Sequence, residues 1–145
     1  VDEGMERPNG IILWPDPGTL VVADTNTASL WTFRIENDGS LSHKQPYYTL
    51  RLTRGHAPKS GADGMTVDRD GRLYVATHAG VQVFDTQGRS SGVIGRPQKA
   101  FLSNLVFAGN GMQTLYATSS DKVYRRKTKV RGLLFASPGK PPSKP

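Results

Sequence analysis

Residues 63–77 read DGMTVDRDGRLYVAT, and this stretch contains two short apolar segments joined by a turn. The segments at 65–67 and 73–77 are rich in β-branched and aromatic residues, whereas the Asp/Gly-rich residues 68–71 between them are typical of a turn. A third apolar segment follows at 80–84. The pattern therefore predicts three short antiparallel strands in sequence order.

The same order of strand and turn segments occurs in two further units. The first unit comprises residues 9–13, a turn at 15–18, and then 20–24 and 30–35; the third comprises 104–107, a turn at 109–113, and then 115–118 and 122–125. The equivalent positions Gly10, Gly64 and Leu105 are 54 and 41 residues apart. These spacings bracket the length of a four-stranded propeller blade.

Fourth strands are predicted at 41–52 and 92–94, each after a turn containing glycine. The longer first spacing comes from a polar insertion at 53–61, which we expect to form a rim or lid loop. The fold prediction is therefore an all-β chain with about three four-stranded antiparallel blades of a β-propeller. We expect this partial propeller to span residues 1–136 and the Pro/Lys-rich residues 137–145 to be a disordered tail.

Three blades do not close a ring, because an open stack leaves strand edges and apolar blade faces uncovered. One interpretation is that the chain is a fragment of a six-bladed parent, whose N-terminal blades belong to the same polypeptide. The alternative is that two copies pair to close one ring. We favour the fragment.

Composition narrows the possible chemistry. The 145 residues are 36% hydrophobic, and no apolar run approaches the roughly 18 to 20 residues of a membrane-spanning helix. Because the chain has no cysteine, it has no thiolate nucleophile and no thiolate metal site. The net charge is +7, but much of the basic excess lies in 122–144 without a recognised nucleic-acid-binding fold. We therefore expect no nucleic-acid partner and no membrane segment, and the sequence does not indicate a compartment.

From the geometry of a propeller blade we expect one set of polar residues to lie together at one mouth of the central tunnel. In a propeller blade the innermost strand begins, and the second strand ends, at the same face. Asn9, Asp63 and Asn104 enter the first strand of the three units. The residues that leave the second strands are Asp24, Thr25, His78, Ser119 and Ser120. A ring of amide and carboxylate oxygens suits a hard divalent cation such as calcium, which takes about six to eight oxygen ligands.

Four segments resemble the gluconolactonase/regucalcin (senescence marker protein)/luciferin-regenerating-enzyme-like family. They are RPNGI at 7–11, LVVADT at 20–25, GADGMTVD at 61–68 and GVQVFD at 80–85, and residues 104–107 match the expected next unit. The resemblance covers roughly residues 7–131. Its specificity comes from the Pro-Asn-Gly and Asp-Gly-Met signatures, which occur in order at the start of two inner strands.

This resemblance implies a six-bladed propeller that hydrolyses sugar lactones or other esters with one divalent cation in its tunnel. It implies that Asn9 and Asp63 are metal ligands and that Asp63 also orients or deprotonates the attacking water. We expect calcium as the metal, with zinc, manganese or magnesium as alternatives. The family's glutamate ligand and an earlier asparagine belong to N-terminal blades that this sequence does not include, so the chain carries an incomplete site.

Each site residue also has a simpler explanation. Asn-Gly and Asp-Gly are ordinary turn dipeptides, and only their equivalent placement in two blades favours ligation by Asn9 and Asp63. We predict that Asp24, His78 and Asn104 line the substrate cavity, although Asp24 is equally typical of a turn and His78 of a solvent-facing loop. The absence of a Gly-x-Ser-x-Gly elbow argues against a serine esterase.

Two other functions remain open. The first is a non-catalytic propeller that binds calcium or another ligand as a scaffold, because one fold hosts many functions. The second is an anion-binding surface built on the basic residues 125–131.

Overall fold

The computed structural model describes residues 2–16 and 18–134. Within these ranges the chain is almost entirely β-strand, with one short 3-10 helix, η1 (Asn110–Met112). The predicted tail at 137–145, and the predicted domain boundary at 136, lie outside the described residues. No helix among the described residues is long and apolar enough to cross a membrane.

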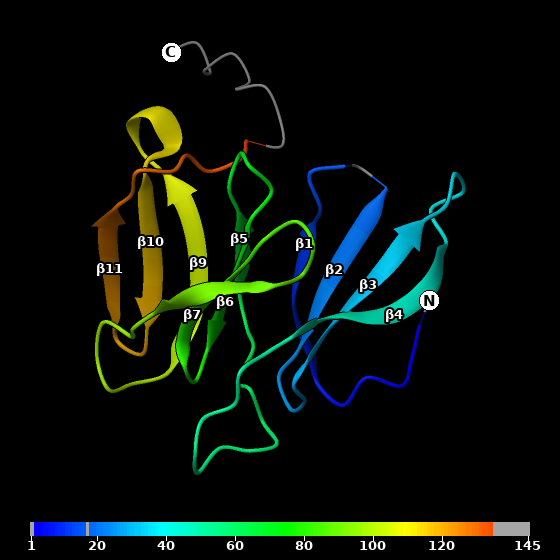
Figure 1. Cartoon of the computed structure of the whole chain (residues 1–145), viewed down its shortest axis with the longest axis horizontal. Coiled ribbons are helices and arrows are strands. Elements are labelled where there is room, and N and C mark those ends of the chain that lie inside the picture. Colours follow the sequence, from blue (N-terminus) through cyan, green and yellow to red (C-terminus); the bar gives the residue numbers. More distant parts are fainter. Residues whose placement is uncertain (1, 17, 135–145) are drawn as a thin grey trace, which may run out of the picture.

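The strands form three antiparallel sheets, each with its strands in sequence order (Figure 1). Blade 1 contains β1 (Pro8–Leu13), β2 (Thr19–Asp24), β3 (Ser29–Ile35) and β4 (Leu41–Thr49). Blade 2 contains β5 (Met65–Val67), β6 (Leu73–Thr77), β7 (Gly80–Phe84) and β8 (Ser90–Ile94). Blade 3 contains β9 (Leu102–Ala108), β10 (Thr114–Ser119) and β11 (Lys122–Lys127). The predicted all-β, three-blade architecture is confirmed; among the described residues, blade 3 has three strands rather than four.

Apolar side chains between neighbouring blades form two cores. Blades 1 and 2 enclose a cluster that includes Val21, Leu30, Tyr48, Val75 and Phe84, and the ring centroids of Tyr48 and Phe84 lie 5.3 Å apart. Blades 2 and 3 enclose a second cluster, which includes Tyr74, Val81, Leu102, Leu105 and Phe107. Because blade 2 is covered on both faces, β5, β6 and β7 are buried at every position.

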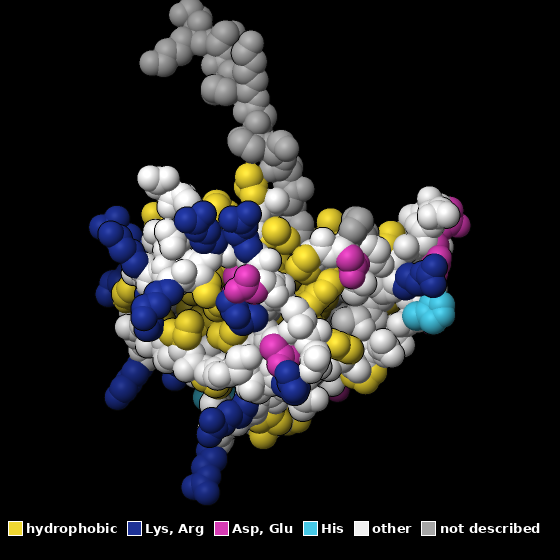
Figure 2. Space-filling model, turned by 45° about the horizontal axis from the view of Figure 1, so that its top comes forward, with side chains coloured by type: hydrophobic (Ala, Val, Ile, Leu, Met, Phe, Trp, Pro, Cys, Tyr) yellow, Lys and Arg dark blue, Asp and Glu magenta, His cyan; other side chains and the backbone are white. Residues whose placement is uncertain are grey.

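The outer side of blade 3 is not covered by another sheet in this chain. Val106 is 54% exposed and Val123 is 71% exposed. Figure 2 shows Lys and Arg side chains gathered around this part of the surface. Residues 96–131 contain eight basic side chains and one acidic side chain. The described ion pairs involve none of these eight cations. The surface proposed from residues 125–131 is thus exposed, and its partner stays a prediction.

The inner strands β1, β5 and β9 lie side by side at the centre of the three blades (Figure 1). Two glycines allow this approach. A Cβ atom added to Gly10 would lie 2.0 Å from the carbonyl oxygen of Asp63, and one added to Gly64 would lie 2.7 Å from the Cα atom of Asn104. Neither glycine has a positive φ, and Gly10 lies inside β1. The turn-dipeptide explanation of these signatures is therefore wrong: their glycines leave room for the neighbouring blade.

We predict that Gly10→Ala destabilises the chain by about 1 to 3 kcal/mol, because a backbone oxygen occupies the space of the new methyl group. Gly95→Ala is the matched control, since Gly95 has no positive φ and nothing lies within 4 Å of an added Cβ. Alanine there is expected to be neutral or stabilising. Urea unfolding of both variants measures the difference, and equal stability would contradict the close approach.

Candidate functional site at the tunnel mouth

The structure brings the signature residues to one end of the three inner strands. Asn9 is the second residue of β1, Asp63 comes two residues before β5, and Asn104 lies near the start of β9. Asp63 donates its backbone N–H to Ala76 at 3.0 Å, and Gly64 donates to Ser103 at 2.8 Å. The backbone around Asp63 is thus fixed to β6 on one side and to β9 on the other.

Asn9 and Asp63 are linked through the end of β2. The Asn9 side-chain Nδ2 donates to Thr25 Oγ1 at 3.3 Å, and this hydroxyl donates to the carbonyl oxygen of Ala62 at 2.8 Å. Thr25 is 9% exposed, whereas the Asn9 side chain is exposed and Asp63 is half-buried. Burial raises the pKa of the Asp63 carboxyl, and Arg7 together with the Gly64 N–H lowers it in part.

The structure gives Asp24 a different role from the predicted one. Its side chain is fully buried, and its carboxylate accepts backbone N–H groups of Glu6 and Arg7 at 3.0 Å and of Asn26 at 3.3 Å. These contacts hold the segment that leads into β1. A carboxylate used in this way does not face the cavity, so the expectation that Asp24 lines the substrate site is wrong.

His78 lies against the insertion at 53–61. Its backbone N–H donates to Ser60 at 2.9 Å, and its ring centroid is 4.3 Å from that of His56 and 5.9 Å from that of Phe101. A Cβ atom on Gly61 would lie 2.6 Å from the His78 ring, so the glycine lets the loop close onto the imidazole. Burial lowers the pKa of His78 from its ordinary value, and His56 and Arg96 lower it further. His78 thus packs between His56 of the insertion and Phe101, which precedes β9, and we call these three rings the aromatic rim.

Comparison with known proteins identifies the family. The model of the SMP-30/gluconolactonase/LRE-like region matches residues 1–121. The chain belongs to this family. A gluconolactonase of Zymomonas mobilis is 30% identical over 135 residues, which cover 91% of this chain and 38% of that protein.

Solved structures of the SMP-30/gluconolactonase family have the same fold. A gluconolactonase from Xanthomonas campestris is 27% identical, with a TM-score of 0.69, and the match covers 90% of this chain and 39% of that one. A luciferin-regenerating enzyme gives a TM-score of 0.75 at 22% identity, covering 91% and 48%. The chain therefore spans less than half the length of these relatives.

The donor atoms at the mouth are oxygens. Among the residues that the structure describes, no group of three or more His, Cys, Asp or Glu side chains is placed to hold a metal ion. The candidate ligands of this SMP-30/gluconolactonase family member are instead the Asp63 carboxylate and the side-chain amides of Asn9 and Asn104. Amide and carboxylate oxygens suit calcium, but three of them do not complete its coordination.

Two residues have contacts at this site that the sequence does not indicate. The sequence places Thr25 at the mouth only because it follows β2, and nothing in the sequence points to Phe101. A threonine after a strand does not by itself indicate which groups its hydroxyl will bond. The hydroxyl partners of Thr25 lie 16 and 37 positions away in the sequence. Phe101 reaches His78 only through the packing of blade 3 on blade 2.

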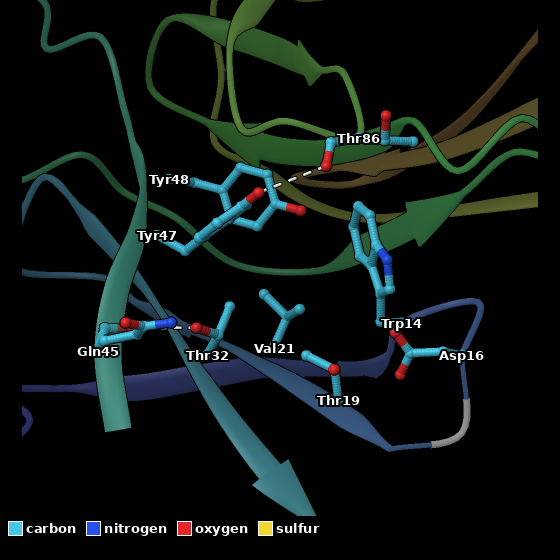
Figure 3. Close-up of a pocket in the computed structure, with 9 residues that line it drawn as sticks. All are labelled: Trp14, Asp16, Thr19, Val21, Thr32, Gln45, Tyr47, Tyr48 and Thr86. Carbon is cyan, nitrogen blue, oxygen red and sulfur yellow. Dashed lines mark hydrogen bonds between the residues drawn. The ribbon is translucent and has the colours of Figure 1, made fainter. Parts of the chain in front are cut away.

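A hollow between blades 1 and 2 is not part of this mouth. Trp14, Thr19, Tyr47 and Thr86 contribute to its wall (Figure 3). Trp14 follows the last residue of β1, whereas Asn9 lies at the start of that strand. The hollow is therefore at the other end of the blade, away from the family signatures.

We predict that NMR titration gives His78 a pKa below the ordinary value of 6.5. The unfolded chain then binds this proton more tightly than the folded chain does. The contribution of His78 to folding stability is therefore present above its unfolded pKa and is lost as pH falls through its folded pKa. Arg96→Gln should raise the pKa of His78 because it removes a nearby positive charge. Arg89→Gln, at an exposed arginine paired with Asp85, is the control and should leave it unchanged. A pKa of 6.5 or higher in the unmodified chain would contradict the packing of the rim.

Proposed function

We propose that this chain is part of a metal-dependent lactone hydrolase and supplies Asn9 and Asp63 as ligands of one divalent cation. The observation that carries the proposal is that the two signature residues come from adjacent inner strands in backbone contact at Gly10. Membership of the SMP-30/gluconolactonase family and the similarity to a gluconolactonase support the reaction class.

The proposed reaction is the addition of water to the carbonyl of a sugar lactone or related ester, with cleavage of the ring C–O bond to give a hydroxy acid. A bound divalent cation polarises such a carbonyl and stabilises negative charge on its oxygen. Calcium fits the oxygen donors best, and zinc, manganese or magnesium are the alternatives. Because the three sheets offer too few ligands, further oxygens come from water and from blades outside this chain.

Asp63 has two candidate roles, metal ligand and proton acceptor, and we propose the ligand role as the main one. Burial alone raises the pKa of its carboxyl, which would favour a proton acceptor. An adjacent cation favours the charged carboxylate and so opposes this shift. As a ligand, Asp63 also orients the attacking water. Asn104 and His78 flank this position and are proposed to contact the substrate.

We predict that Asp63→Ala, in the complete polypeptide that contains this chain, lowers hydrolysis of gluconolactone by at least about 100-fold, because a direct ligand matters at least as much as the residues that support it. Asp70→Ala is the matched control, since that side chain is 67% exposed in a turn. Acid release with and without calcium measures the reaction.

Unchanged hydrolysis in the Asp63→Ala variant would remove this residue from the mechanism. Calcium-dependent thermal stabilisation without hydrolysis, across a panel of lactones and esters, would instead favour a binding scaffold.

A further inference from the structure

Thr25 joins the two segments that carry Asn9 and Asp63. Its backbone N–H donates to the carbonyl oxygen of Arg7 at 2.9 Å, and its own carbonyl oxygen accepts the N–H of Gly61 at 3.1 Å. Its hydroxyl contacts Asn9 and Ala62. Every polar group of Thr25 is therefore bonded either to the entrance of β1 or to the residues just before Asp63.

The hydroxyl of Thr25 also determines which way the Asn9 amide faces. A hydroxyl has one hydrogen to donate, and the carbonyl oxygen of Ala62 can only accept. The hydrogen of Thr25 Oγ1 therefore points to Ala62, 2.8 Å away. Toward Asn9 the hydroxyl oxygen can only accept, so the NH₂ group of the amide faces Thr25. The amide oxygen Oδ1 is left on the other side of the side chain, free of this contact.

From this network we infer that Thr25 is a positioning residue, which turns the Asn9 amide so that its oxygen rather than its nitrogen is offered to the cation. The inference rests on the proposed metal site. Thr25 acts through Asn9 and Ala62, which are its side-chain partners. The same hydroxyl fixes Ala62, the residue before Asp63, and so couples the two ligands.

The first experiment measures calcium affinity by titration calorimetry on the complete polypeptide that contains this chain, because the three sheets alone offer too few ligands. Thr25→Val keeps the shape of the side chain but removes the hydroxyl, and it should weaken binding by about 10- to 100-fold, the usual effect of losing a residue that orients a ligand. Thr25→Ser keeps the hydroxyl and should recover most of the affinity. Thr32→Val is the matched control, because Thr32 is also buried and its hydroxyl bonds a carbonyl of β4 away from the mouth.

A double-mutant cycle separates positioning from general loosening of the fold. If Thr25 acts through the amide, Thr25→Val should have little further effect on affinity once Asn9→Ala has removed that amide. Additive losses in the double variant, or equal affinities of Thr25→Val and the unmodified chain, would overturn the inference.

A second measurement does not depend on metal. In the metal-free chain, hydrogen exchange of the Asn9 side-chain NH₂, observed by NMR, should be slowed by the contact with Thr25 and should become faster in Thr25→Val. The same exchange rate in both proteins would overturn the inference even if calcium binds. Failure of the unmodified complete polypeptide to bind calcium, with the expected change in exchange, would instead count against the proposed metal site alone.

Discussion

The inner strands approach each other closely at Gly10 and Gly64, and the rest of the structure depends on this contact. Gly10 and Gly64 have no room for a Cβ atom, since the neighbouring blade already fills that space. With a side chain at either position the blades would have to separate, and the two apolar cores between them would open. The same contact brings Asn9, Asp63 and Asn104 to one mouth.

Buried polar contacts then determine the details of this mouth. Asp24 holds the entrance of β1 through backbone N–H groups, and Thr25 ties Asn9 to Ala62. The insertion closes onto His78 because Gly61 leaves space for the imidazole ring. The backbone of the candidate site is therefore held by contacts of Asp24, Thr25 and Gly61.

Much of the fold could be predicted from the sequence, because strand and turn residues repeat in a fixed order around the Asp63 signature. The role of Gly10 and Gly64 could not be predicted, because a glycine needed for the close approach of two strands and a glycine in a turn look alike in a sequence. Asp24 was misassigned for a similar reason: its partners, the N–H groups of Glu6 and Arg7, are backbone atoms that carry no residue signal. The contacts of Thr25 depend on the packing of blade 1 against the segment before blade 2, and the contact of Phe101 with His78 depends on the packing of blade 3 against blade 2.

The proposed metal site requires Asn9 and Asp63 to converge on one cation. Anomalous diffraction from crystals of the protein soaked in terbium, an ion close to calcium in size, tests this convergence most directly, because the peak locates the ion independently of the protein atoms. We expect one peak at roughly 2.3 to 2.6 Å from both the Asn9 amide oxygen and the Asp63 carboxylate, the range of calcium–oxygen contacts. A peak bonded to only one of these residues, or bound elsewhere while the tunnel mouth shows none, would contradict it.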